Sequence, residues 1–101
     1  MIRKLNKTVF CKDGFEMSVQ ANDTAYCDPR IAHADKYISV EIGFPNRIEE
    51  MILEYAEDRE SPTGTVYAYV PSSLVSLVIA KHGGIVEGEL PAGIPYLRAD
   101  W

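Results

Sequence analysis

The feature that most limits the possible folds is an Asp-Gly pair, Asp13-Gly14, set between two stretches rich in apolar residues. Asp-Gly favours a two-residue hairpin turn, because both central positions of that turn need a positive φ angle. Counting outward from the turn pairs Phe10 with Met17 and Thr8 with Val19. This register places on one buried face Phe10, Phe15, Met17 and Val19, and on the other Val9, Cys11, Glu16, Ser18 and Gln20.

Three further strands are predicted after the hairpin. Residues 37–44 alternate between apolar and polar side chains, which indicates a strand whose buried face carries Ile38, Val40, Ile42 and Phe44. Residues 65–70 are mainly β-branched or aromatic and predict a second strand, and 85–89 a short third one. The segment 22–36 has no sustained period. We interpret it as a long loop, either functional or simply mobile.

Two helices are expected between these strands. Asn46 is a plausible N-cap for the first, with Glu49 three residues later completing a capping box and apolar residues following at helical spacing. The second begins near Pro71-Ser72-Ser73 and ends at Lys81-His82-Gly83-Gly84. Cations in the last turn followed by glycine are typical of a helix C-terminus.

The expected fold is therefore α+β, with the order β-β-β-α-β-α-β. It has a mainly antiparallel sheet of four to five strands and two helices packed on one face. The 101 residues are predicted to form a single domain, 1–101, because so short a chain has no room for a second core. Residues 90–101, which include two prolines, are expected to be an irregular tail.

Charge excludes one class of function. The formal net charge is −5, which argues against direct binding to nucleic-acid phosphates, because such binding needs clustered lysine and arginine. No apolar run approaches the roughly 20 residues that cross a bilayer, and the first residues lack the pattern of a secretory signal. We therefore expect a cytoplasmic protein that binds no membrane, with Cys11 and Cys27 as free thiols.

The residue types of several catalytic sites are present, but not in a motif. A cysteine hydrolase needs a histidine base beside its thiolate, and Cys27 and His33 share the 22–36 loop. A free cysteine is more often a small buried hydrophobe, and His82 is explained by its place at a helix end. Zinc sites normally show Cys-x-x-Cys or two closely spaced histidines. We expect no enzyme activity, no cofactor and no metal. The alternative is a small enzyme or ligand-sequestering domain that uses Cys27, Asp28, Arg30 and His33.

Two groups of residues are candidates for partner binding. The acidic residues of the first helix can face a basic surface, or can simply be solvated. The strand tyrosines are expected opposite the apolar side chains, where aromatic residues are favoured at interfaces. Alternatively, the C-terminal tail folds over that face and buries them against Ile94, Leu97 and Trp101. The predicted partner-binding residues are Glu49, Glu50, Glu54, Glu57, Asp58, Tyr37, Tyr67 and Tyr69.

Three segments of the chain together resemble small uncharacterised proteins of tailed bacteriophages and prophages: 11–21 (CKDGFEMSVQA), 40–45 (VEIGFP) and 62–71 (PTGTVYAYVP). Small acidic phage proteins include inhibitors of host defence, the anti-CRISPR proteins among them. The resemblance implies a protein that inhibits a host nucleic-acid-processing or defence complex by occupying a protein surface. It assigns no residue a role. A homodimeric structural or accessory phage protein is a further alternative.

Overall fold

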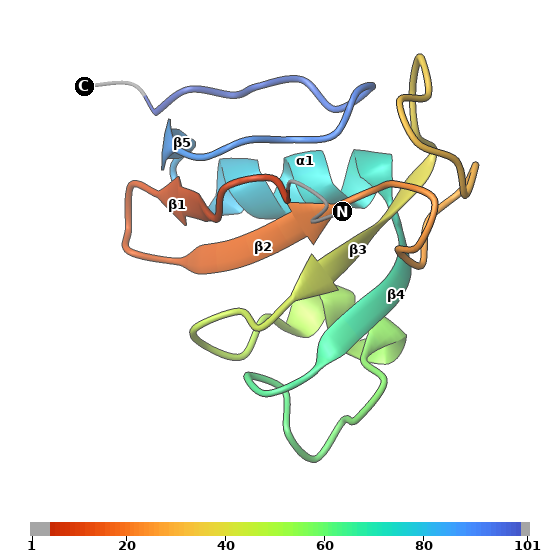
Figure 1. The fold of residues 1–101 in the computed structure, drawn as a ribbon. Coiled ribbons are helices and arrows are strands. Elements are labelled where there is room, and N and C mark those ends of the chain that lie inside the picture. Colours follow the sequence, from red (N-terminus) through yellow and green to blue (C-terminus); the bar gives the residue numbers. More distant parts are fainter. Residues whose placement is uncertain (1–4, 100–101) are drawn as a thin grey trace.

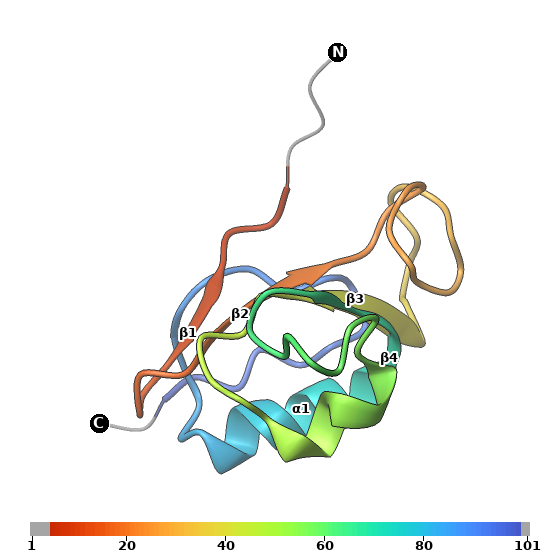
Figure 2. The same ribbon diagram turned by 90° about the horizontal axis from the view of Figure 1, so that it is seen from below.

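The computed structural model describes residues 5–99 and contains a five-stranded sheet with two helical segments (Figure 1). In chain order the elements are β1 (Val9–Cys11), β2 (Glu16–Gln20), β3 (Ser39–Gly43), the 3-10 helix η1 (Glu50–Tyr55), β4 (Val66–Pro71), α1 (Ser72–Lys81) and β5 (Ile85–Glu87). The strands lie in the order β4-β3-β2-β1-β5, and all neighbours are antiparallel. The α+β prediction is confirmed, and Figure 2 shows both helical segments on one side of the sheet.

The core lies between the sheet and these helical segments. Val9, Phe15, Met17 and Val19 of the hairpin, Val40 and Ile42 of β3, Ile52 of η1 and Val75, Val78 and Ile79 of α1 are all fully buried. Burial of such side chains away from water stabilises the fold by about 1.5–3 kcal/mol each. None of the helices that the structure describes is long and apolar enough to span a membrane.

The hairpin forms as predicted, but its register was predicted wrongly by one residue. The Cys11 N–H donates to the Phe15 carbonyl at 2.8 Å, so the turn is a three-residue loop, 12–14, in which Gly14 has a φ of +92°. Three-residue loops of this kind place glycine at the left-handed position. A slip of one residue exchanges the two faces of a strand. Accordingly Val9 and Cys11 are buried and Phe10 lies on the solvent side.

Strand β3 is shorter than expected. Val40 and Ile42 are buried as predicted, but Ile38 and Phe44 at its two ends are exposed. Phe44 has a φ of +49°, which turns the chain out of the strand before Pro45. The predicted alternation therefore holds only within Ser39–Gly43, the residues that form β3.

A bulge in β4 changes the faces of that strand as well. Val40 pairs with Val70 and Ile42 with Tyr67, so β4 has two residues, Ala68 and Tyr69, opposite the single residue between them in β3. The extra residue lets Tyr67 and Val70 both point into the core. Uninterrupted alternation would have placed Tyr67 on the opposite face, which is why the prediction for it failed.

The first helix also begins differently from the prediction. Glu49, not Asn46, is the N-cap, and its carboxylate accepts the Met51 N–H at 3.0 Å. Asn46 instead fixes the hairpin: its side-chain oxygen accepts the Glu16 N–H, and its amide donates to the Gly14 carbonyl. The segment that follows is a six-residue 3-10 helix, shorter than the three turns expected.

The expected tail is irregular and lies beside β5 (Figure 1). The Ile85 N–H donates to the Leu97 carbonyl, and the Ala99 N–H donates to the Ile85 carbonyl. At the opposite edge of the sheet, along β4, the Glu57 N–H donates to the Val66 carbonyl and the Tyr69 N–H donates to the Tyr26 carbonyl. Both outer strands are thus partly covered by the chain's own backbone. Residues 100–101 of the predicted tail, Trp101 among them, lie outside the described residues.

Candidate functional site

Four of the five acidic residues predicted for partner binding are exposed. Glu50 and Glu54 lie on η1, and Glu57 and Asp58 lie in the segment after it. Arg59 is close by, and its guanidinium donates to the Glu54 carbonyl at 3.0 Å. This side of the molecule therefore presents carboxylates to solvent.

Glu49 does not belong to that exposed group, and its prediction as a surface residue is wrong. It is 1% exposed, and its carboxylate accepts hydrogen bonds from Lys81, His82 and the Met51 N–H. The reason is its N-cap position, which turns the side chain inward, toward the end of α1.

Two of the three predicted tyrosines are buried as well. The Tyr37 hydroxyl donates to the Ile31 carbonyl at 2.7 Å and accepts the Ala34 N–H, so this ring packs under the 22–36 loop. Tyr67 lies in the core, and its hydroxyl donates to the Pro62 carbonyl at 2.6 Å. Neither residue can serve as a surface contact. The alternative in which the tail covers these tyrosines holds in part for Tyr37, whose N–H donates to the Ala92 carbonyl and whose backbone lies close to Gly93, while Trp101 lies outside the described residues.

Tyr69 is exposed, and the structure adds a partner that the sequence pattern did not reveal. The rings of Tyr69 and Tyr26 are 6.1 Å apart, and the Arg30 guanidinium lies 5.3 Å from the centre of the Tyr26 ring. The Tyr26 N–H donates to the Glu41 carboxylate at 3.0 Å, which holds the 22–36 loop against the sheet. No sequence signal pairs Tyr26 with Tyr69, because the pairing depends on how the loop folds back.

The backbone at Tyr69 is strained. Its φ is +54°, a left-handed conformation that costs a residue with a Cβ about 1–2 kcal/mol. Glycine is the residue that adopts this conformation without that cost. Backbone strain of this size is found most often at binding and catalytic sites, where the surrounding structure maintains it.

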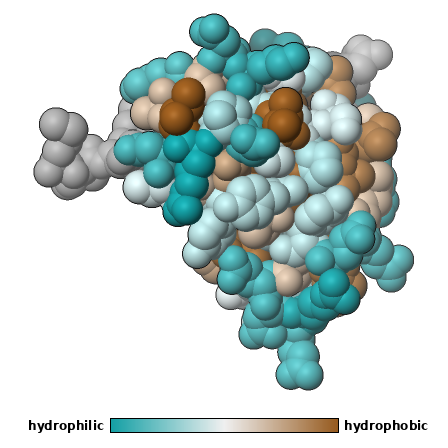
Figure 3. All heavy atoms as spheres, turned by 90° about the vertical axis from the view of Figure 1, so that its right-hand side faces the viewer, coloured by the Kyte–Doolittle hydropathy of each residue, from teal (hydrophilic) through white to brown (hydrophobic). Residues whose placement is uncertain are grey.

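We define the β4-edge surface as the exposed residues on both ends of this sheet edge: Tyr26, Arg30, Tyr69, Glu50, Glu54, Glu57 and Asp58. At the aromatic end of this surface, a backbone hydrogen bond joins the Tyr69 N–H to the Tyr26 carbonyl. At the acidic end, a second one joins the Glu57 N–H to the Val66 carbonyl. Figure 3 views this side of the molecule. Hydrophilic side chains gather at its lower end, beneath a paler central area, and isolated hydrophobic groups lie near its upper end.

A second cluster, buried, is formed by residues far apart in the sequence. His82 follows α1, Asp13 lies in the β1–β2 turn and Glu49 precedes η1. The His82 Nδ1 lies 2.6 Å from an Asp13 oxygen, and its Nε2 lies 2.6 Å from a Glu49 oxygen. The Phe15 ring stacks on the imidazole at 4.0 Å, with 9° between the planes. We call these three polar residues the Asp13–His82–Glu49 network.

Both carboxylates of the network are held in the charged form. Burial alone would raise the pKa of Glu49, but hydrogen bonds from Lys81, the Met51 N–H and His82 outweigh it and lower that pKa. Desolvation is likewise opposed at Asp13, whose pKa is lowered chiefly by its hydrogen bond with His82. Since both ring nitrogens face carboxylates, the imidazole has no free nitrogen with which to act as a general base. The network joins the β1–β2 turn and the segment before η1 to the end of α1.

The thiols do not form a nucleophilic site. The Cys27 thiol donates to the carbonyls of Asn22 and Pro29, and burial raises its pKa. Burial and the nearby Asp13 raise the pKa of Cys11 to about 11. His33 is exposed, and within residues 5–99 no hydrogen bond joins it to Cys27. The same residues contain no cluster of histidine, cysteine and carboxylate side chains that could hold a metal ion.

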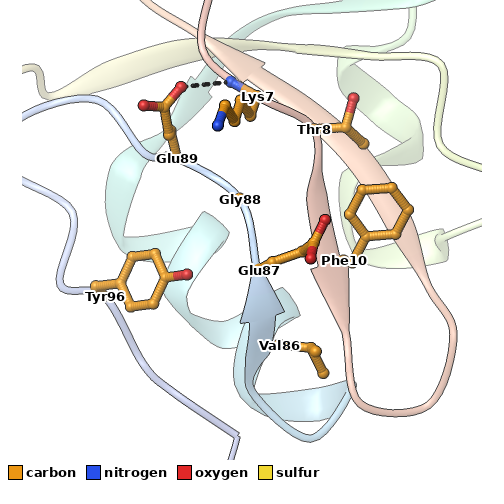
Figure 4. A pocket seen from close by; sticks show the side chains of 8 residues that line it. All are labelled: Lys7, Thr8, Phe10, Val86, Glu87, Gly88, Glu89 and Tyr96. Carbon is orange, nitrogen blue, oxygen red and sulfur yellow. Dashed lines mark hydrogen bonds between the residues drawn. The ribbon is translucent and has the colours of Figure 1, made fainter.

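An open groove of about 590 Å³ lies at the opposite end of the sheet, beside β5. Figure 4 shows its lining, in which the Glu89 carboxylate is already bonded to the Lys7 N–H at 2.8 Å. Its walls combine one amine, two carboxylates and two aromatic rings without a common direction. The residues that line it are Lys7, Thr8, Phe10, Val86, Glu87, Gly88, Glu89 and Tyr96.

Comparison with protein-family models, with curated proteins and with solved structures finds no match to this chain. Function is therefore argued from the geometry of the chain itself.

Proposed function

We propose that this chain is a binding protein that occupies a surface of a protein partner through the β4-edge surface, and that it is not an enzyme. The observation that carries the proposal is the exposed pair Tyr26–Tyr69 at the edge of β4, the strand whose other end is hydrogen-bonded to Glu57 of the acidic segment. Tyrosine is enriched at interface centres because it offers a large contact area and a polar tip with little side-chain freedom to lose.

The charge of this surface supports a basic partner. Glu50, Glu54, Glu57 and Asp58 are exposed, and the only arginines close to them in the sequence are Arg47 and Arg59. The negative potential of these carboxylates speeds association with a positively charged surface, and this effect falls as the salt concentration rises. Because no region of clustered lysine and arginine accompanies it, direct contact with nucleic-acid phosphates is not part of the proposal.

The resemblance to small phage proteins makes the proposal more specific. Proteins that handle nucleic acids carry basic surfaces, and an acidic domain can cover such a surface. The partner would then be a protein or nucleoprotein complex of a host cell that processes nucleic acid or acts in defence, and binding would inhibit it.

The proposal is tested with two charge-reversal variants that change the net charge equally. Glu50→Lys with Glu54→Lys takes the net charge from −5 to −1, since each change adds two units. Glu16→Lys with Glu87→Lys does the same at the other end of the sheet, where both residues flank Phe10. We expect affinity capture from a bacterial lysate to recover basic nucleic-acid-binding proteins with the parent chain and the second variant, and to lose them with the first.

A second variant tests the tyrosine pair separately from charge. Tyr69→Gly removes the ring and relieves the left-handed strain, so the melting temperature should stay the same or rise. Binding to the captured partner should weaken at least about tenfold, as for an interface residue that carries much of the binding energy. Full binding by both the Tyr69 variant and the Glu50/Glu54 variant would refute the proposed surface.

A further inference from the structure

The hydrogen bonds of the Asp13–His82–Glu49 network depend on one proton of the imidazole ring. A neutral imidazole has a single N–H and can donate to only one carboxylate, whereas the imidazolium ion donates from both nitrogens. Both His82 nitrogens lie 2.6 Å from a carboxylate oxygen. The arrangement in the structure is therefore that of the imidazolium ion, and removal of one proton must break one of the two contacts.

The two carboxylates differ in what happens when that contact is lost. Glu49 is 1% exposed, and its other oxygen accepts from Lys81 at 2.8 Å and from the Met51 N–H at 3.0 Å. If it left His82, the charge would keep Lys81 as a partner, but the buried Oε1 would lose the hydrogen bond from the ring. The Asp13 side chain is 41% exposed and also contacts Arg47 at 3.1 Å. It can rotate into water and keep a cationic partner.

We propose that the network is a one-sided proton switch: loss of the imidazolium proton releases Asp13 and the 12–14 turn from the end of α1, while the His82–Glu49 contact and η1 stay in place. The backbone bond that would open with Asp13 is that from its N–H to the His82 carbonyl, at 3.2 Å.

The remaining charges around His82 fit this asymmetry. From α1, Lys81 approaches Glu49, and from the segment before η1, Arg47 approaches Asp13. The turn itself contributes Asp13 and Lys12, whose Cβ lies against Gly83, and the buried Cys11 thiol stays protonated with a pKa of about 11. Each carboxylate thus retains one cation when the ring becomes neutral. Of the two carboxylates, only Glu49 also keeps its place in the core.

Nuclear magnetic resonance can follow the ring and the two contacts in one titration. The ¹⁵N spectra of the His82 ring report its protonation, and amide hydrogen exchange of Asp13 and Met51 reports the two sides of the network. We expect protection of the Asp13 N–H, corrected for intrinsic exchange, to fall about tenfold as His82 loses its proton, which corresponds to one lost hydrogen bond. Protection of the Met51 N–H should not change with it.

Asp13→Asn is the matched control, because its amide can donate to a neutral ring nitrogen and therefore has no need to leave. In this variant the exchange of residue 13 should no longer follow the His82 titration. Equal loss of protection at Asp13 and Met51 would overturn the one-sided switch. So would unchanged protection at Asp13 while the ring titrates, or a ring that keeps its proton over the whole range in which the protein is folded.

Discussion

Replacing His82, the buried residue that caps the C-terminal end of α1, by alanine should destabilise this protein strongly. The change leaves Glu49, which is 1% exposed, with one cation instead of two, and removes the ring that stacks on Phe15. Breaking a buried charge pair by removing one partner typically costs about 3–5 kcal/mol, and the stacked ring adds about 1 kcal/mol. Because Lys81 still compensates Glu49, we expect a total loss near the lower end of this sum, about 4 kcal/mol.

A double-mutant cycle separates the two carboxylates of the network. The His82–Glu49 coupling should be the larger, because both groups are buried. The His82–Asp13 coupling should stay below about 1 kcal/mol, because solvent screens the 41% exposed Asp13 side chain. Urea unfolding of the parent, His82→Ala, Glu49→Ala, Asp13→Ala and the two double variants measures both couplings. A His82–Asp13 coupling equal to or larger than the His82–Glu49 coupling would refute the reasoning.

Three further outcomes are expected. The pKa of Glu49 is lowered in the folded protein, so the charged carboxylate stabilises the fold fully above its unfolded pKa of about 4.3. This stabilisation is lost as the pH falls through the folded pKa. Glu49→Gln should therefore flatten the acid decline of the urea midpoint measured from pH 7 to 2. The Cys11 thiol should react with a disulfide reagent at pH 8 at least about a hundredfold more slowly than in the unfolded chain, and equal rates would contradict its burial. Gly88→Ala should lower the free energy of unfolding by about 2 kcal/mol or more, because the added Cβ would lie 2.6 Å from the backbone of residues 8–9. In Gly64→Ala the close contact of the added Cβ is with a rotatable side chain, so thermal stability should change by less than about 0.5 kcal/mol.

The elements of this fold could be read from local pattern, because apolar periodicity reports which face of a single segment is buried. Such patterns predict the burial of Val40 and Ile42 in β3 and the end of α1 at Lys81. The hairpin register could not be read in the same way. Asp-Gly is compatible with two-residue and three-residue loops, and the choice depends on Asn46, which bonds to the turn from 32 residues away.

The candidate site was predictable only where it consists of exposed charge. Glu54 and Glu57 are exposed as expected for acidic residues on an outer face. Tyr67 was misplaced because one inserted residue in β4 reverses its face, and Glu49 because a cap position turns its carboxylate inward. The partners of His82 lie 33 and 69 residues away in the chain, so no spacing rule could have joined them.

The cover over the two outer strands has a consequence for how this protein can meet other chains. A bare strand edge invites a foreign strand to join it, which is both a means of peptide recognition and a route to aggregation. Here the Tyr26 carbonyl and the Glu57 N–H already use backbone groups of β4, and Leu97 and Ala99 use those of Ile85 at the start of β5. A ligand at these places must be recognised by side chains rather than by extension of the sheet, and the folded chain is protected there against fibril-like self-association.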